Sequence, residues 1–458
     1  MRAMHGRAGT VIERLRGELD RSLFRPAQPG SLRFGGWEGA LVLVSFLVLV
    51  GVLQVLRAGP ESIGALFAED GAVFLGEGLS HGLFSSLVTP YAGYLVLIPR
   101  LLGEAGATLP LRYAPETMNI GAVLVVGVSG LAVWVSSAGL VRSSFLRVLL
   151  VALVLLPPTS GLETVVTATN VIWYSSFAVF WLLLWKPETT WGAGLGGLLI
   201  LCAGLSSPAF FFFLPLAALR AIAIRDRRDG LIVGAYGLAL AIQAPVTALG
   251  EEASDPTWTA NILTTLLQRV VAGSALGLEL AGEAWAEWGW AFLAPISIAV
   301  AAVLLALALR ASSGRLFALI AVLTGVGMFL ASCYQRALGP TMVWYEGGYN
   351  SLGARYVMIP ALLVASAAIV LADSRGRREG GRPWVAVATA VVLVLAMITS
   401  FGGDANRDMP SWRGSLRQGA AECRAQGAES EPIPISPAEW TVAIPCERLE
   451  SEYAAPAP

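Results

Sequence analysis

The sequence is poor in charge, in histidine and in lysine. Asp, Glu, Lys and Arg make up 14% of its 458 residues, whereas soluble domains usually carry about 25%. It has two histidines, His5 and His81, and Lys186 is its one lysine. The net charge of −1 gives no indication of nucleic-acid binding, because that function calls for a basic excess. Nothing in the sequence resembles a zinc-ligand cluster.

Several motifs of soluble enzymes are also missing. The sequence contains no P-loop and no HExxH. Charged residues are almost absent from the long apolar runs, although a transporter for ions or polar solutes would normally need polar groups near mid-bilayer. Gln243, beside Pro245, is the main candidate for such a group. These absences argue against nucleotide hydrolysis and ion coupling.

The sequence is rich in long apolar runs. It is 55% hydrophobic with a mean hydropathy of +0.67, and runs long enough to cross a bilayer, about 20 residues each, recur along it. We expect an all-α, polytopic transmembrane bundle of about eleven spans. The N-terminus is polar for its first 35 or so residues, so we expect no cleavable signal peptide and a first run that stays as an anchor. The expected spans are 39–56, 118–140, 145–157, 171–185, 192–206, 209–224, 230–248, 289–309, 315–333, 355–372 and 384–401.

Arginine placement predicts the orientation of these spans. Short cytoplasmic loops are enriched in basic residues, and here the basic residues fall mainly in alternate loops. This pattern predicts a plasma-membrane protein with a cytoplasmic N-terminus and, for an odd number of spans, an extracytoplasmic C-terminus. The expected cytoplasmic segments are 1–38, 141–144, 186–191, 225–229, 310–314 and 373–383.

The remaining polar material gathers on the opposite side. We expect a transmembrane domain over 39–401, with external loops at 57–117, 249–288 and 334–354, and a short extracytoplasmic tail at 402–458. Loop 57–117 has apolar residues at helical spacing, which predicts interfacial helices. In the tail, Cys423 and Cys446 could pair if it faces an oxidising compartment, which would stabilise it by roughly 3 kcal/mol; the alternative is two unrelated thiols.

The first loop carries an adjacent pair of acids, Glu69 and Asp70, in "LFAEDGAVFLGEG". Acids at a membrane boundary are commonly solvated loop residues. The apolar neighbours of this pair instead suggest a position against apolar surface, where a carboxylate can act as a general base with a shifted pKa. Two adjacent acids cannot share one helix face. We expect Asp70 to be the base, with Glu69 as a partner, a cap or part of a site for a divalent cation.

The same loop continues with "PYAGYLVLIPRL", which holds Tyr91, Tyr94 and Arg100 on an expected interfacial helix. Tyrosines are also common in the aromatic belts at membrane–water interfaces, so these two could be ordinary interface residues. Arg100 lies on the outer side, where charge bias does not explain it. Its guanidinium suits a phosphate, or it snorkels to headgroups.

Two further polar groups lie at outer ends of spans. In "GLETVVTATNVIWYSS" an amide and two aromatic rings could bind a sugar, or they could be ordinary interface residues. In "WYEGGYNSLGARYVMIP" an arginine and a tyrosine stand before a late span, and the arginine could bind a phosphate or snorkel. The residues concerned are Glu163, Asn170, Trp173, Tyr174, Arg355 and Tyr356, with Glu346 and Tyr349 as loop contacts.

An acidic pair in a large first external loop, followed by interfacial helices and alternating spans, resembles the GT-C class of membrane glycosyltransferases. The "EDG" of residues 69–71 is the core of the match, and the "RY" of residues 355–356 fits less specifically. The resemblance implies a donor sugar on a polyprenyl phosphate, an acid of the first loop as base or metal ligand, and Arg100 and Arg355 as candidates for the lipid phosphate. The class often has Asp-Glu or Asp-Asp where this chain has Glu-Asp, so either acid could be the base.

The expected function is therefore transfer of a sugar from a polyprenyl-phosphate carrier to a cell-envelope glycan or lipid acceptor, on the extracytoplasmic face. One alternative is a glycan polymerase, ligase or lipid-linked-sugar flippase without acid–base chemistry, which would depend more on the outer arginines. Another is a membrane scaffold with no catalytic role. The sequence identifies neither the sugar nor the acceptor.

Overall fold

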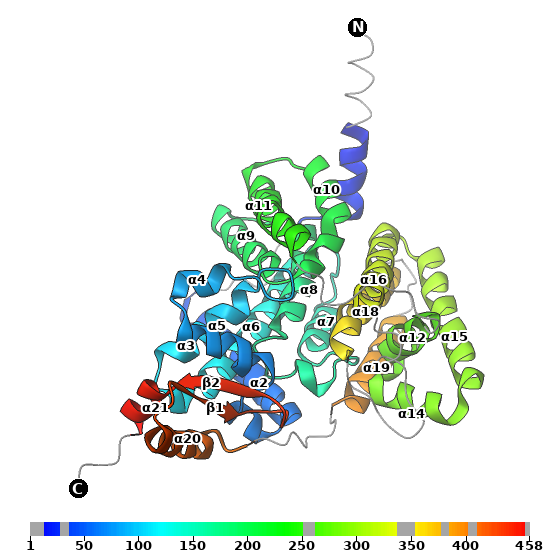
Figure 1. Cartoon of the computed structure of the whole chain (residues 1–458). Coiled ribbons are helices and arrows are strands. Elements are labelled where there is room, and N and C mark those ends of the chain that lie inside the picture. The colour runs from blue at the N-terminus through cyan, green and yellow to red at the C-terminus, as the bar shows by residue number, and fades with distance from the viewer. Residues whose placement is uncertain are drawn as a thin grey trace.

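The computed structural model of the chain is dominated by helices (Figure 1). It describes residues 13–27, 36–250, 262–336, 353–376, 384–401 and 410–453. The predicted all-α class is confirmed for these residues, with the exception of one two-stranded antiparallel hairpin near the C-terminus. Residues 13–22 form a helix at the N-terminal end.

Six helices among the described residues are long and apolar enough to cross a membrane. They differ in burial: 94% of the apolar stretch of α18 is buried inside the molecule, against 11% for α2. This contrast makes α18 the central helix and leaves α2 with an apolar outer surface suited to lipid. The six are α2 (Gly36–Ala58), α6 (Ala114–Ser136), α11 (Arg227–Leu249), α15 (Trp290–Arg310), α16 (Arg315–Arg336) and α18 (Ala354–Gly376).

Shorter apolar helices fill the rest of the bundle, so the chain is an α-helical, multi-pass membrane protein. A single helix needs about 20 residues to span the hydrocarbon core, and helices such as α8 have fewer. The expectation of eleven spans is therefore not confirmed, although each expected span coincides with a helix. The shorter elements are α7 (Ser144–Leu155), α8 (Val171–Leu184), α9 (Thr190–Gly204), η6 (Pro208–Phe213), α10 (Leu214–Ile222), α12 (Ile262–Thr265), η7 (Leu266–Ala272), α13 (Gly273–Leu276), α14 (Leu278–Trp288) and α19 (Trp384–Thr399).

Side-chain caps begin several of these helices. The Ser143, Thr189 and Ser411 hydroxyls and the Asp226 carboxylate each accept a hydrogen bond from a backbone N–H of the first turn. Such caps satisfy donors that would otherwise lack a partner at a helix start, and each contributes about 1 kcal/mol. The sequence therefore marks where α7, α9, α11 and α20 (Trp412–Gln426) begin.

One end of the bundle collects the loops that carry the basic residues predicted to be cytoplasmic. Side-chain contacts tie these loops to one another and to the N-terminal helix. Which side of the membrane this end faces stays a prediction from arginine placement. The contacts are Lys186 Nζ to Asp20 at 2.6 Å, Arg25 Nη1 to the Ser313 hydroxyl at 3.3 Å, and Ser143 N to Asp373 at 3.0 Å.

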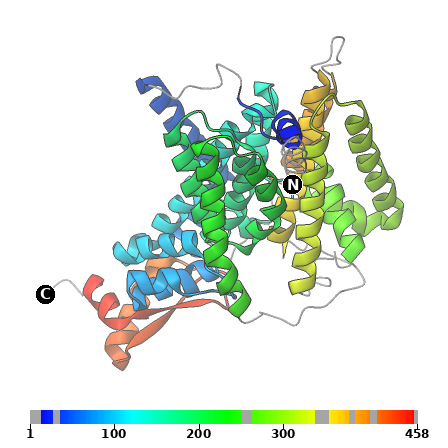
Figure 2. The ribbon, with the colours of Figure 1, turned by 90° about the horizontal axis from the view of Figure 1, so that it is seen from above.

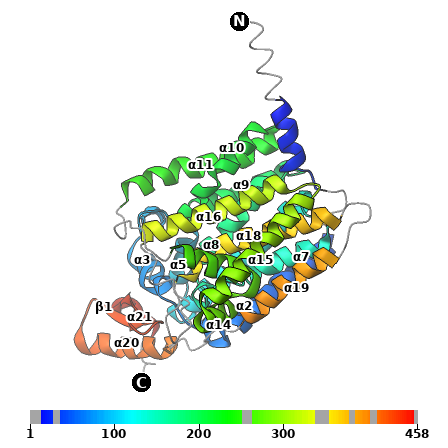
Figure 3. The same ribbon diagram turned by 90° about the vertical axis from the view of Figure 1, so that its right-hand side faces the viewer.

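The opposite end carries the first loop and the C-terminal tail, and Figures 1 and 3 show the tail far from the N-terminal helix. The loop contains short helices in the region where interfacial helices are expected: η1 (Pro60–Gly64), η2 (Asp70–Leu75), α3 (Gly76–Ser80), α4 (Leu83–Val88) and α5 (Leu97–Thr108). The tail folds into α20, β1 (Ser430–Pro434), β2 (Thr441–Pro445) and α21 (Cys446–Glu452). The predicted disulfide between Cys423 and Cys446 is present and joins α20 to the start of α21.

Candidate functional site

A partly open cavity of about 580 Å³ lies at this end of the bundle. Its walls come from the first loop, from the residues that precede and begin α8, from η6, from the C-terminal end of α11, and from α16 and α18. Seven of the eleven residues predicted for catalysis or substrate binding line it. They are Glu69, Tyr91, Tyr94, Asn170, Trp173, Arg355 and Tyr356.

Glu69 is the member of the acidic pair that lines the cavity. Its side chain is half-buried, and its Oε1 accepts a long hydrogen bond of 3.4 Å from the Tyr91 hydroxyl. The charges of Glu69 and Arg355 are close enough to interact. The cavity therefore presents a carboxylate and a guanidinium to the same space.

Asp70 is fully buried and does not line the cavity. Its Oδ2 accepts a hydrogen bond from Ala168 N at 2.9 Å, and its Oδ1 accepts from Thr169 N at 2.7 Å and from the Thr169 hydroxyl. Burial raises the pKa of Asp70 to about 6, although these three donors favour the carboxylate. The two acids thus differ in place: Asp70 holds residues 168–169, and Glu69 faces the open space.

Tyr91 and Tyr94 lie on a tight turn, so the expectation of one interfacial helix across residues 90–101 is wrong. The two residues exchange backbone hydrogen bonds of 2.8 and 3.2 Å, and Ala92 and Gly93 between them have φ of 49° and 84°. Positive φ at both central positions is the signature of a type I′ turn. The helix α5 begins at Leu97. The turn, rather than a helix face, places both rings at the cavity.

The segment 163–170 ends in Thr169 and Asn170, which line the cavity. Asn170 joins the two ends of this segment: its Nδ2 donates to Glu163 O at 2.7 Å, and its Oδ1 accepts from Trp173 Nε1 at 3.2 Å. The amide predicted to bind hydroxyls is therefore already engaged with the protein on both of its polar atoms. Its place in the wall sets the position of Trp173.

Glu163 and Arg355 connect this segment to α18. Glu163 accepts a hydrogen bond from Arg355 N at 3.0 Å, and the guanidinium Nη1 lies 3.9 Å from its Oε2. Burial raises the pKa of Glu163, against the attraction of Arg355. Beside this pair, the Trp173 and Tyr356 rings meet edge to face with centroids 5.4 Å apart. The contact with Glu163 thus orients Arg355, and 30% of its side chain stays exposed.

Backbone strain concentrates in the same three segments. Among the described residues, the non-glycine positions with positive φ are Ala68 at 45°, Ala92 at 49° and Val166 at 52°. A β-branched residue such as valine is rare in this region, and such strain tends to gather at functional sites. Ala68 precedes Glu69, Ala92 follows Tyr91, and Val166 lies two residues before the pair 168–169 that Asp70 holds. The strain supports a functional interpretation of the cavity.

Besides Asp70 and Glu163, two more predicted residues do not line the cavity. Arg100 is fully buried on α5, where it forms an ion pair with Glu77 and lies 5.8 Å from the centre of the Phe74 ring. Tyr174 is buried on α8, and its hydroxyl donates to Thr164 O at 3.2 Å. The structure therefore brings Arg355, but not Arg100, to the site. Glu346 and Tyr349 fall outside the described residues.

The rest of the lining could hardly be recognised from the sequence. Phe211, Phe212 and Met328 form an apolar wall, but apolar residues in membrane helices do not stand out. Thr169 lines the cavity and binds Asp70. Gln243, the candidate for polar transport, is buried and bonds both the N–H and the C=O of Leu95, so it holds the segment that follows the tyrosine turn.

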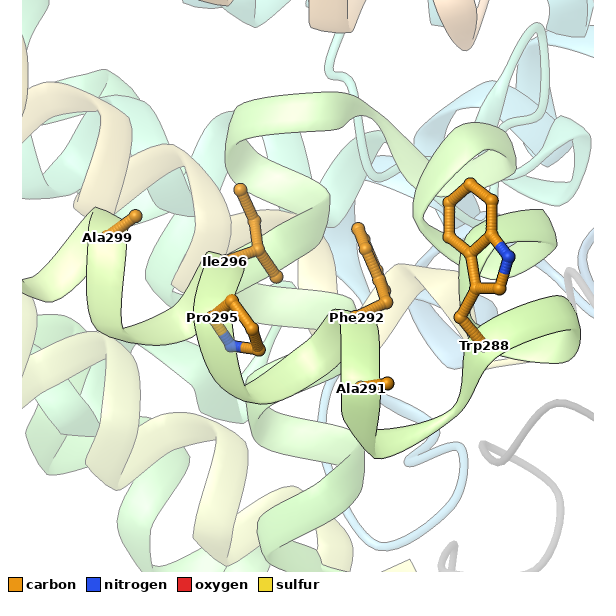
Figure 4. A pocket seen from close by; sticks show the side chains of 6 residues that line it. All are labelled: Trp288, Ala291, Phe292, Pro295, Ile296 and Ala299. Atoms are coloured by element: carbon orange, nitrogen blue, oxygen red, sulfur yellow. The ribbon is translucent and has the colours of Figure 1, made fainter.

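A second hollow lies on α14 and α15, outside the packed part of the bundle (Figure 4). Figure 4 shows its six lining side chains, and none of them is charged. Among the described residues, no group of three or more His, Cys, Asp and Glu could hold a metal ion. The divalent cation expected near Glu69 and Asp70 therefore stays a prediction.

No family model, no curated protein and no solved structure matches this chain. The fold and the cavity define its class: a multi-pass α-helical membrane protein with a polar, aromatic-lined cavity.

Proposed function

We propose that the protein is a membrane glycosyltransferase that uses this cavity to transfer a sugar from a polyprenyl-phosphate carrier to a hydroxyl acceptor. The observation behind the proposal is that one cavity holds a carboxylate, a guanidinium and four aromatic rings with a polar atom. Glu69 supplies the carboxylate and Arg355 the guanidinium. These four rings are those of Tyr91, Tyr94, Trp173 and Tyr356.

The lining of the cavity suits an amphiphilic donor. Glu69, Tyr91, Asn170 and Arg355 make one part of it polar, whereas Ile172, Pro208, Phe211, Phe212 and Met328 make another part apolar. A phosphorylated sugar fits the polar part, because guanidinium groups bind phosphate oxygens and flat rings stack on pyranose faces. An isoprenoid chain fits the apolar part. The lipid would reach it from the bilayer.

The reaction is a single displacement. Glu69 accepts the proton of the acceptor hydroxyl as its oxygen bonds to the anomeric carbon of the donor. The bond from that carbon to the phosphate oxygen breaks at the same time, and the anomeric configuration inverts. The polyprenyl phosphate leaves with the electron pair, and Arg355 balances its charge. Asp70 stays beneath the site and keeps residues 168–169 in place.

The proposed site faces the extracytoplasmic side. It shares its end of the bundle with the disulfide-bonded tail, and disulfides persist in oxidising compartments. The opposite end carries the loops rich in basic residues, which the positive-inside rule assigns to the cytoplasm. The two arguments rest on different residues and agree.

The experiment is a transfer assay with purified protein in liposomes, synthetic polyprenyl-phosphate sugars and a panel of hydroxyl acceptors. Glu69→Gln keeps the shape of the side chain and removes the base. We expect it to lower product formation by about 10²–10⁴-fold, the usual contribution of a general base. Glu61→Gln changes an exposed acid of the same loop and is the matched control, with activity close to wild type.

The alternatives give different results with substitutions at Glu69, Asp70 and Arg355. If Glu69→Gln and Asp70→Asn keep full activity while Arg355→Ala abolishes it, a polymerase, ligase or flippase without acid–base chemistry fits better. If none of the three changes matters to glycan assembly in cells, the scaffold interpretation holds and the glycosyltransferase proposal fails.

A further inference from the structure

The C-terminal tail packs against the first loop beside the acidic pair (Figures 1 and 2). Its own core consists of apolar side chains of α20, the hairpin and α21, such as Leu416, Ile433, Val442 and Leu449, each at most 1% exposed. The Cys423–Cys446 bond closes this small core. A unit with so few buried residues depends on such a crosslink for stability.

The first attachment of the tail is made by its main chain, directly before Glu69. Ala68 N donates to Ser436 O at 2.6 Å, and Ser436 N donates to Leu66 O at 3.1 Å. Phe67 and Ser436 thus pair as in a parallel sheet. Ala68 has the strained φ of 45°, and this pairing holds it in that conformation. The tail therefore contacts the main chain directly before Glu69.

The second attachment lies at the C-terminal end of α5. Arg448 Nη2 donates to Ala107 O at 3.2 Å and to Leu109 O at 2.9 Å. Glu452 accepts from Leu111 N at 2.7 Å, and Trp412 Nε1 donates to Leu111 O at 2.8 Å. These contacts satisfy backbone groups around the end of α5. With two separate attachments, the tail holds residues 66–68 in a fixed place relative to α5.

None of the described tail residues lines the cavity, so the tail can act on the site only through the first loop. We infer that the disulfide-closed tail is a positioning element for Glu69: it holds the strained segment 66–68 in the conformation that directs the carboxylate into the cavity. Reduction of Cys423–Cys446 loosens this segment and lowers turnover. The inference rests on the proposed function, because Glu69 is taken as the base.

The test compares wild type, wild type treated with a membrane-impermeant phosphine reductant, and Cys423→Ser/Cys446→Ser, all in liposomes. The first readout is amide hydrogen exchange of residues 66–70, which requires no activity. Exchange at the Ala68 amide should be faster by at least about tenfold once the tail opens locally. Unchanged exchange would overturn the inference.

The second readout is steady-state transfer. A displacement of about 1 Å can cost 10²-fold in rate, so kcat should fall by at least about tenfold. KM for the lipid donor should stay within about twofold, because Arg355 is untouched. Faster exchange with an unchanged kcat would show that the tail is only structural. Full activity of Glu69→Gln would end the proposed function instead, and the exchange readout would still report on the tail.

A second variant covers the case in which the double serine protein does not accumulate. Arg448→Ala keeps the disulfide and removes two bonds to the end of α5, so we expect the same division between kcat and KM with a smaller loss. Arg424→Ala breaks an exposed hydrogen bond within the tail, to Tyr453 O at 3.3 Å, and is the matched control. Equal behaviour of the Arg448 and Arg424 variants would overturn the inference.

Discussion

The two adjacent acids should respond in opposite ways to removal of their charge. In Asp70→Asn, one carboxylate oxygen becomes an NH2 group, which must face the N–H of Ala168 or of Thr169 because both point at this side chain. A buried donor without an acceptor costs about 1–3 kcal/mol. In Glu69→Gln, the remaining oxygen can still accept from the Tyr91 hydroxyl, so stability should be unchanged.

The expected changes in Tm and in kcat distinguish the two variants. Asp70→Asn should lower the Tm by about 1–3 °C if the unfolding entropy scales with length as in soluble domains, and it should keep part of the activity because the base remains. Glu69→Gln should keep the wild-type Tm and lose about 10²–10⁴-fold in kcat. Thermal unfolding followed in detergent and transfer followed in liposomes give the two numbers.

The opposite pattern would refute the reasoning. If Asp70→Asn unfolds at the wild-type temperature and is inactive, while Glu69→Gln is fully active, then Asp70 is the reacting acid. Residues 168–169 would then have to move to expose it. Protease resistance of both variants, compared with Glu61→Gln, checks that each has folded before activity is interpreted.

Three further outcomes follow from the structure. Burial raises the pKa of Asp70 from 3.8 to about 6, so the folded state binds this proton more tightly than the unfolded state. The free energy of unfolding should therefore fall by about 3 kcal/mol as pH rises from about 4 to 6 and then level off. The same measurement on Asp70→Asn should show no such decrease. Arg355→Ala should raise KM for the lipid donor by about 10- to 100-fold, because a charge-assisted bond contributes about 1.5–3 kcal/mol, and Arg355→Lys should recover part of the loss. In intact cells, an impermeant thiol reagent should label Cys423 and Cys446 only after reduction, and labelling without reductant would contradict the bond.

Most of the cavity lining that carries charge or an aromatic hydroxyl was predictable from sequence. Glu69, Tyr91 and Arg355 stand out because polar side chains are rare next to long apolar runs. The choice between Glu69 and Asp70 was not predictable. It depends on the backbone of Ala68 and on the donors of residues 168–169, which come from a segment about 100 positions away in the chain.

Arg100 and the tail show the same limit. Arg100 looked like a free outer cation because its partner Glu77 lies 23 residues earlier, on another short helix, and no local pattern pairs them. The tail was read as a short external segment with one disulfide. The tail pairs with residues 66–68 through main-chain hydrogen bonds. Because nearly every residue carries the same backbone donor and acceptor, such contacts cannot be recognised from the sequence.

The attachment of the tail also bears on biogenesis. The contact between Leu111 and Glu452 joins positions 341 residues apart, and every helix around the cavity is synthesised between them. If the tail faces the extracytoplasmic side, as in the proposed orientation, the contact with Glu452 forms only after the tail has crossed the membrane and been oxidised, when those helices are already inserted. Catalytic competence would therefore come last, after insertion is complete, and chains that stall or lose the tail during export would reach the membrane without it.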